Sequence, residues 1–256
     1  MRKAINIRLL PAALLLASAP MAMAANRPPQ NNAITNTCIG QNFDGVTAPA
    51  LPLGWSTTVT GAPSTAPWIT RAVSYNDTGP NAAFLDDAND YADASLTSKI
   101  YNVTSVDIPY VVFRHSFVLW SPDPSNLNNG AFNGGVFEIS INGGPFVDLV
   151  TAGGSFYTGG YNAHLDPGFE NPIDQPPSGR AVWSGDSGGF ITTTAIIPAS
   201  ASGKPVQFRW RLGTSGGSRS YDTHSGWWVD TLETQALATV SDYIFVDGFE
   251  GGNCAP

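Results

Sequence analysis

Aspartate side chains, which calcium ions prefer as ligands, are concentrated in one short stretch of this chain. Four lie between residues 86 and 93, and two more lie near the two ends of the expected domain; the six are Asp44, Asp86, Asp87, Asp90, Asp93 and Asp230. Calcium takes roughly six to eight oxygen ligands, so we expect a structural calcium ion at these residues. The alternative is a solvated acidic turn, in which aspartate is favoured for its turn chemistry. The chain has no EF-hand spacing.

A serine in a glycine-rich segment offers a second kind of chemistry. Ser187 lies in Gly-Asp-Ser-Gly-Gly, similar to the nucleophile loop of trypsin-like serine proteases, and His115 and Asp148 precede it in the chain. A nucleophilic serine needs a histidine base that is itself oriented by a carboxylate. However, His115 lies in a phenylalanine-rich segment that does not match that family. We favour a turn entering a strand, with a secreted serine hydrolase as the alternative.

Charged and aromatic side chains on expected outward faces and loops form a third group. They are Arg114, Glu138, Tyr157, Tyr161, Arg209 and Arg211. The simple explanation is cross-strand Arg–Glu pairing, worth about 0.2–1 kcal/mol per pair. The functional explanation is a surface that binds a glycan or a protein, with the aromatic rings available for stacking. We therefore treat these six residues as candidate ligand-binding residues.

The elements that must position these groups are β-strands, and the clearest pair surrounds Asn142-Gly143-Gly144. Apolar and polar residues alternate from Gly134 to Ile141, the pattern of a strand with one buried face. An apolar run resumes at Phe146, and Asn-Gly between two such runs is a strong β-hairpin signal. The segment predicts a central hairpin in an all-β domain.

Further strands follow from the same alternation. We expect them over 109–119, 205–212 and 226–233, with a shorter strand that begins at residue 81 and ends in the acidic loop. His115 falls on the apolar face of the first of these strands. A buried histidine is usually hydrogen-bonded to a neighbour, and Glu138 is the carboxylate that we expect as its partner.

The first residues predict export. Arg2, Lys3 and Arg8 precede a short apolar run, and Ala22-Met23-Ala24 fits a cleavage site, so residues 1–24 are expected to be a signal peptide. Residues 25–40 are a polar, Pro/Asn-rich linker. Cys38 and Cys254 flank the domain, and in an oxidising compartment they predict one disulfide that holds the ends together.

Charge limits the partners. The net charge is −8, and removing the signal with its three basic residues takes it to −11. A strongly acidic chain is a poor ligand for nucleic acid or for anionic membranes. No apolar stretch after the signal approaches the roughly twenty residues of a membrane helix. We expect an extracellular partner, either a glycan or a protein; the oligomeric state stays open.

Taken in order, several short motifs resemble the MAM-like jelly-roll domain, in the bacterial secreted variant found beside secreted peptidases and anchor domains. The motifs are FDG at 43–45, GW at 54–55, AFLD at 83–86, LTS at 96–98, VFRH at 112–115, GVFEI at 135–139, VQFR at 206–209 and GWWVD at 226–230. The resemblance covers residues 41–235 and leaves 236–256 as a tail packed on or appended to the domain. It implies a two-sheet antiparallel β-sandwich of the jelly-roll, galactose-binding-like kind.

The resemblance also implies a function. Such domains are mainly adhesion or accessory modules, and several hold a structural cation near the joined termini, which implicates Asp44 and Asp230. The chain departs from the MAM pattern at Thr231, where a second acidic residue is usual, and it lacks most of the MAM cysteines. We expect a secreted, non-catalytic adhesion or recognition module with a calcium ion as its cofactor; the alternatives are the serine hydrolase and a purely structural accessory domain.

Overall fold

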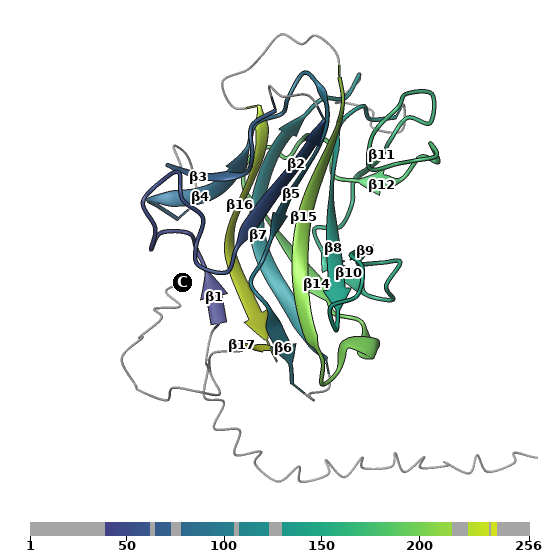
Figure 1. Cartoon of the computed structure of the whole chain (residues 1–256). Coiled ribbons are helices and arrows are strands. Elements are labelled where there is room, and N and C mark those ends of the chain that lie inside the picture. The colour runs from purple at the N-terminus through teal and green to yellow at the C-terminus, as the bar shows by residue number, and fades with distance from the viewer. Residues whose placement is uncertain are drawn as a thin grey trace, which may run out of the picture. The chain divides into compact units, whose positions relative to one another are not determined.

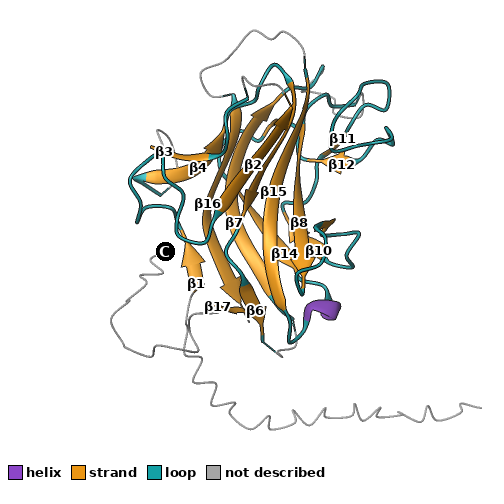
Figure 2. Cartoon of the chain, in the orientation of Figure 1, coloured by secondary structure: helices purple, strands orange, loops and turns teal. Residues whose placement is uncertain are grey.

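Long alternating segments of this sequence form the strands of two antiparallel sheets. A computed structural model describes residues 39–61, 65–72, 78–104, 108–122, 130–216, 225–235 and 237–239. Within these residues every ladder between named strands is antiparallel. The helical structure there is one 3₁₀ turn, η2 (Ala199–Ala201) (Figure 2). The all-β, two-sheet prediction is confirmed.

The first sheet is built around two ten-residue strands, β7 and β16. Its order is β10 (Ser155–Thr158), β14 (Ile191–Ile196), β7 (Tyr110–Leu119), β16 (Gly226–Gln235), β4 (Asn81–Leu85) and β3 (Ile69–Ala72). Two short strands join it at the side: β1 (Ile39–Gln41) pairs with β16, and β13 (Gly185–Asp186) pairs with β7.

The second sheet is built around β15, which carries two of the three candidate arginines, Arg209 and Arg211. Its order is β17 (Leu237–Thr239), β6 (Tyr101–Val103), β15 (Pro205–Ser215), β5 (Tyr91–Thr97) and β2 (Ser56–Gly61). β8 (Gly134–Ile141) also pairs with β15, and β9 (Val147–Asp148) pairs with β8. β11 (Ala163–His164) and β12 (Ala181–Val182) form a separate small ladder (Figure 1).

The predicted hairpin is present as β8 and β9. Asn142 and Gly143 have φ values of 55° and 70°, so both central residues of the turn lie in the left-handed region that Asn-Gly tolerates. Gly144 N donates to Ile141 O at 3.0 Å and closes the turn. The register that follows places Glu138 opposite Asp148.

The core lies between the two sheets and is rich in aromatic rings. Phe113 on β7 contacts Phe137 on β8 at a centroid distance of 5.0 Å and Trp210 on β15 at 5.3 Å. These three side chains are fully buried. The inward residues expected for β7 and β15 are the ones buried here, because alternation in a strand places every second side chain on one face.

We expected only one face of β8 to be buried, but both faces of this strand are buried. Glu138 and Ser140 are buried, and Val136 belongs to a second apolar cluster with Val182, Ile173 and others. The connection that runs from β10 to β13 covers this part of the sheet and supplies most of that cluster. A local period-2 pattern cannot show this, because the covering residues lie far along the chain.

Some predictions fall at the limits of the described chain. Cys38 and Cys254, the signal peptide, the linker up to residue 38 and the tail from residue 240 lie outside the described residues. β17 lies in the segment predicted as a tail and pairs with β6. In the part that the structure describes, no helix has the length and apolar character needed to span a membrane.

Candidate functional site

Charged side chains gather on the outer face of the second sheet, at the β8–β9 hairpin. Glu138 on β8 lies directly opposite Arg209 on β15 and opposite Asp148 on β9. Arg211 lies two residues further along β15, so period-2 geometry puts its side chain on the same face. Three segments of the chain thereby converge on one point.

Glu138 is the centre of this network, with 2% of its surface exposed. Its Oε2 accepts a hydrogen bond from Arg209 Nε at 2.6 Å and a further contact from Arg209 Nη2. Its Oε1 accepts from Arg180 Nη2 at 3.1 Å and from Arg211 Nη1 at 3.4 Å. Both carboxylate oxygens are therefore satisfied by arginine, as a buried charge requires.

Two further carboxylates balance the three arginines. Arg180 Nη2 also reaches Asp148 Oδ2 at 3.3 Å, and Arg211 makes a two-bond contact with Asp93 at 2.8 and 2.7 Å. These bonds from Asp93 raise the pKa of Arg211, against the opposing effect of burial. Three positive and three negative side chains make the network neutral. Each arginine keeps about a fifth of its side chain exposed, 20% for Arg180 and 21% for the other two.

Tyr161 connects the network to the backbone of β8. Its hydroxyl donates to Asp148 Oδ2 at 2.7 Å and accepts from Phe137 N at 3.0 Å. Burial and the negative charge of Asp148 raise the pKa of Tyr161 well above its ordinary value. The hydroxyl thus stays protonated and holds Asp148 in place at physiological pH.

Asp174 fixes the loop that delivers Arg180. Its carboxylate accepts from Ser178 Oγ at 2.5 Å and from the backbone N–H groups of Ser178, Gly179 and Arg180. Burial tends to raise the pKa of Asp174, but these hydrogen bonds outweigh it and the pKa lies below its ordinary value. Arg180 Nη1 donates to Ile173 O at 2.8 Å, which completes the attachment of the loop.

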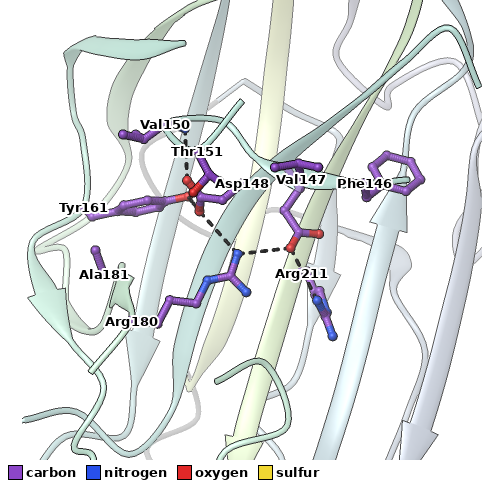
Figure 3. A pocket seen from close by; sticks show the side chains of 10 residues that line it. Phe146, Val147, Asp148, Val150, Thr151, Tyr161, Arg180, Ala181 and Arg211 are labelled. Atoms are coloured by element: carbon purple, nitrogen blue, oxygen red, sulfur yellow. Dashed lines mark hydrogen bonds and ion pairs between the residues drawn. The ribbon is translucent and has the colours of Figure 1, made fainter. Parts of the chain in front are cut away.

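A hollow of about 500 Å³ opens above this network. Its floor is polar and its rim is partly apolar; the lining residues are Glu138, Phe146, Val147, Asp148, Val150, Thr151, Tyr161, Arg180, Ala181 and Arg211. Figure 3 shows Arg180 and Tyr161 reaching the carboxylate of Asp148, with Val150 and Thr151 beside it. Val150 is 52% exposed. The hollow joins fixed donors and acceptors to an exposed apolar edge.

Four of the six candidate ligand-binding residues meet at this hollow or in its network: Glu138, Tyr161, Arg209 and Arg211. Arg114 instead lies on β7 of the first sheet, with its guanidinium 5.8 Å from the Phe190 ring centroid. Tyr157 lies on β10 and is 79% exposed. The sequence prediction missed Arg180 and Phe146, and it weighed Asp148 only for catalysis.

The six candidate calcium ligands occupy several separate environments. Asp87 is buried and accepts from Trp120 N at 3.0 Å and Asn133 Nδ2 at 2.6 Å. We expected Asp93 in an acidic loop, but it lies on strand β5 and binds Arg211. Asp86 and Asp90 lie between β4 and β5. Among the described residues, no three acidic, histidine or cysteine side chains group as a metal site.

Asp44 and Asp230 approach the same short segment. Asp44 Oδ1 accepts from Asn81 N at 2.9 Å, and Asp230 Oδ2 accepts from Thr78 Oγ1 at 2.8 Å. Residues near the two ends of the domain thus meet at the start of β4. That these two residues hold a cation, as the resemblance implies, stays a prediction.

The serine, histidine and aspartate that could form a triad point to different partners. Ser187 Oγ accepts from Phe117 N at 2.9 Å and contacts Gly189 O at 2.8 Å, in a turn that enters β14. Asp148 lies on β9 of the second sheet and binds Tyr161 and Arg180. His115 bonds with neither. The segment is the strand-entry turn that we favoured.

His115 is fully buried as expected, but its expected partner Glu138 is wrong. Trp227 Nε1 donates to His115 Nδ1 at 3.2 Å, so the ring proton is on Nε2, which donates to Thr193 Oγ1 at 2.8 Å. Thr193 Oγ1 in turn donates to Gly159 O at 2.7 Å. Glu138 cannot reach this ring, because it faces outward from the other sheet whereas His115 faces the core.

Burial lowers the pKa of His115 to about 3. Between about pH 6.5 and pH 3 the unfolded chain binds a proton that the folded chain excludes, so folding stability decreases as the pH falls. We expect the unfolding free energy to drop by up to about 1.4 kcal/mol per pH unit below pH 6.5. Urea unfolding at pH 7 and pH 5 measures this slope. His115→Gln should remove it, whereas His164→Gln, at an exposed histidine, should keep it; an unchanged slope in the first variant would contradict the assignment.

Comparison with known proteins gives distant structural similarities alone. No protein-family model and no curated protein matches the chain. Among solved structures, the K2 cleaved adhesin domain of Lys-gingipain matches with a TM-score of 0.41 and 15% identity, over 77% of this chain and 96% of that one. The K1 cleaved adhesin domain of Lys-gingipain from Porphyromonas gingivalis W83 matches with a TM-score of 0.39 and 12% identity, over 78% and 98%. Similarity at this level does not assign a family.

Proposed function

We propose that this chain is an exported, non-catalytic recognition module and that the hollow beside the β8–β9 hairpin binds a carbohydrate. The observation that carries the proposal is the hollow itself, with a charged but neutral floor of arginines and carboxylates. A sugar hydroxyl both donates and accepts hydrogen bonds, so a floor that alternates donors and acceptors suits it. The apolar rim at Phe146 and Val150 offers contact for the ring C–H groups.

The charges of the floor support binding rather than catalysis. Glu138 and Asp148 both contact Arg180 Nη2, at 3.1 and 3.3 Å, so the contacting oxygens are close enough to suggest a glycosidase pair. However, both oxygens of Glu138 are occupied by arginine and its side chain is 3% exposed. A carboxylate held in this way fixes the arginines that contact a ligand.

Preorganisation is the second support. A buried ion network is often no more stable than apolar packing of the same volume, so folding stability alone gives little reason for it. Side chains that are already fixed lose little entropy when a ligand binds. The exposed fifth of Arg180 and of Arg211, the two arginines that line the hollow, is then available for charge-assisted hydrogen bonds to ligand hydroxyls.

A substitution that fills the hollow tests this proposal. Val150→Trp places a large ring in the mouth of the hollow without altering the network, and Leu53→Trp, at a residue that is 98% exposed elsewhere, is the matched control. We expect glycan-array binding by residues 25–256, with affinity reduced at least about tenfold, or about 1.4 kcal/mol, by Val150→Trp alone. Absence of binding to every glycan, or equal binding by both variants, would overturn the proposal and leave a structural accessory domain.

A structural calcium ion stays a proposal for Asp44 and Asp230. The support is that both carboxylates bind the segment from Thr78 to Asn81, which joins the two ends of the domain. An ion bound only by the folded state raises its stability by mass action. We expect EDTA to lower the melting temperature and added calcium to restore it, with magnesium as the control. Equal melting temperatures in all three conditions would contradict the proposal.

A further inference from the structure

At one end of the sandwich, three aromatic rings form a continuous surface outside the hollow. Trp120 follows β7, Phe132 precedes β8, and Phe169 lies in the long connection between β11 and β12. The Trp120 and Phe132 rings are 4.6 Å apart at 67°, and the Phe132 and Phe169 rings are 4.2 Å apart at 50°. Phe132 is the middle ring of the three, and Phe169 at the end of the row is 50% exposed, which is unusual for a phenylalanine.

Buried polar side chains fix the backbone that carries these rings. Asp87 accepts from Trp120 N and from Asn133 Nδ2, and Asn133 Oδ1 accepts from Ser215 N at 2.9 Å. Asn171 Nδ2 donates to Phe132 O at 2.8 Å and to Gly213 O at 3.0 Å. Asp87, Asn133 and Asn171 are all at most 2% exposed. A buried polar network of this kind makes the aromatic surface rigid.

The aromatic surface and the hollow lie along the same elements. Phe132 lies in a bend just before β8, and the strand from its first residue, Gly134, to Glu138 rises by about 13 Å. Phe169 and Arg180 are likewise carried by the same connection, whose start pairs with residue 131 through the Ala131–Leu165 bridge. A ligand that reaches both places must be longer than one sugar ring.

We propose that the aromatic surface of Trp120, Phe132 and Phe169 is a second subsite of the carbohydrate site, and that the ligand is an extended oligosaccharide. This inference rests on the proposed function. The rings contact one another and form a continuous surface, whereas a cation cage needs aromatic walls around a central space. The rings are inclined to one another, and the exposed half of Phe169 offers a ring face against which a sugar ring can pack. The neighbouring carboxylates Asp166 and Glu170 offer acceptors for its hydroxyls and disfavour an acidic ligand.

The dependence of affinity on the length of the oligosaccharide tests the proposed second subsite. The probes are cello-, malto-, xylo- and chito-oligosaccharides, each from the monosaccharide to the hexasaccharide, titrated by calorimetry against residues 25–256. In the series that binds, we expect affinity to rise with length until both surfaces are covered. Phe169→Ala should reduce hexasaccharide affinity by about tenfold and leave disaccharide affinity unchanged. Leu53→Ala, at another exposed apolar residue, is the control.

The outcomes separate the subsite from the proposed function. Binding that is blocked by Val150→Trp but is independent of chain length and of Phe169→Ala would overturn the subsite and keep the hollow. Hexasaccharide binding that Phe169→Ala abolishes and Val150→Trp leaves intact would overturn the hollow and make the aromatic surface the main site. No binding in any series would overturn both.

Discussion

Glu138→Ala is expected to lower the free energy of unfolding by about 3–5 kcal/mol, because it leaves three partly buried arginines without the buried carboxylate that they share. Arg180, Arg209 and Arg211 all contact this one side chain. The substitution also removes packed atoms from the lining of the hollow, since the Glu138 side chain is buried there. Equilibrium unfolding in urea measures the loss.

Two comparisons sharpen this prediction. Glu138→Gln keeps the shape and one acceptor, so it should lose less than the alanine variant. Glu170→Ala, at an exposed glutamate, should change stability by about 0.5 kcal/mol or less. A loss below about 1 kcal/mol for Glu138→Ala would mean that water replaces the carboxylate and that the floor of the hollow is not the preorganised surface described above.

Trp183→Ala is expected to have a similarly large effect, a loss of about 3–5 kcal/mol. Trp183 is fully buried, and its ring packs against His115 at 4.8 Å and Tyr161 at 4.8 Å. Its Nε1 donates to the carbonyl groups of Gly159 and Gly160 at 3.0 and 2.9 Å. The substitution therefore loosens both the core and the start of the connection that carries Tyr161.

Ser187→Ala, four residues further along, gives the contrast. The serine hydroxyl is partly buried and makes ordinary hydrogen bonds to Phe117 and Gly189, so its removal should reduce stability by about 1 kcal/mol. A fluorophosphonate probe should not label the wild-type protein at this serine. Labelling that disappears in Ser187→Ala would contradict the assignment of this segment as a turn. Equal stability losses for Ser187→Ala and Trp183→Ala would contradict it as well.

Much of the fold could be predicted because its longest strands have one face in the core. The alternation of β7 and β15 holds except near Ser116 and Gly213, and the Asn-Gly turn indicates the β8–β9 hairpin. The hairpin register also brings Asp148 opposite Glu138. These features depend on residues close together in sequence, which a reader of the sequence can compare directly.

The site could be predicted only in part, because its third arginine arrives from a distant loop. Arg180 follows a proline-rich segment with no strand or helix pattern, and its position depends on Asp174 and on packing of the connection over β8. The same packing explains why Glu138 is buried rather than exposed. The acidic residues at 86–93 predicted a shared calcium site, but Asp87 and Asp93 instead bind protein groups from residues 120, 133 and 211.

The shared carboxylate of Glu138 has a consequence for how this sequence can change over evolutionary time. Its arginine partners come from one strand, β15, and one loop, separated by up to 73 residues from Glu138. The effects of substitutions within such a group on stability are strongly non-additive. A substitution at one position therefore changes how much stability is lost by substitutions at the other positions. Homologous chains should therefore keep the charged group as a set or replace it as a set with apolar residues. The chains that replaced it would share the sandwich and differ in what they bind.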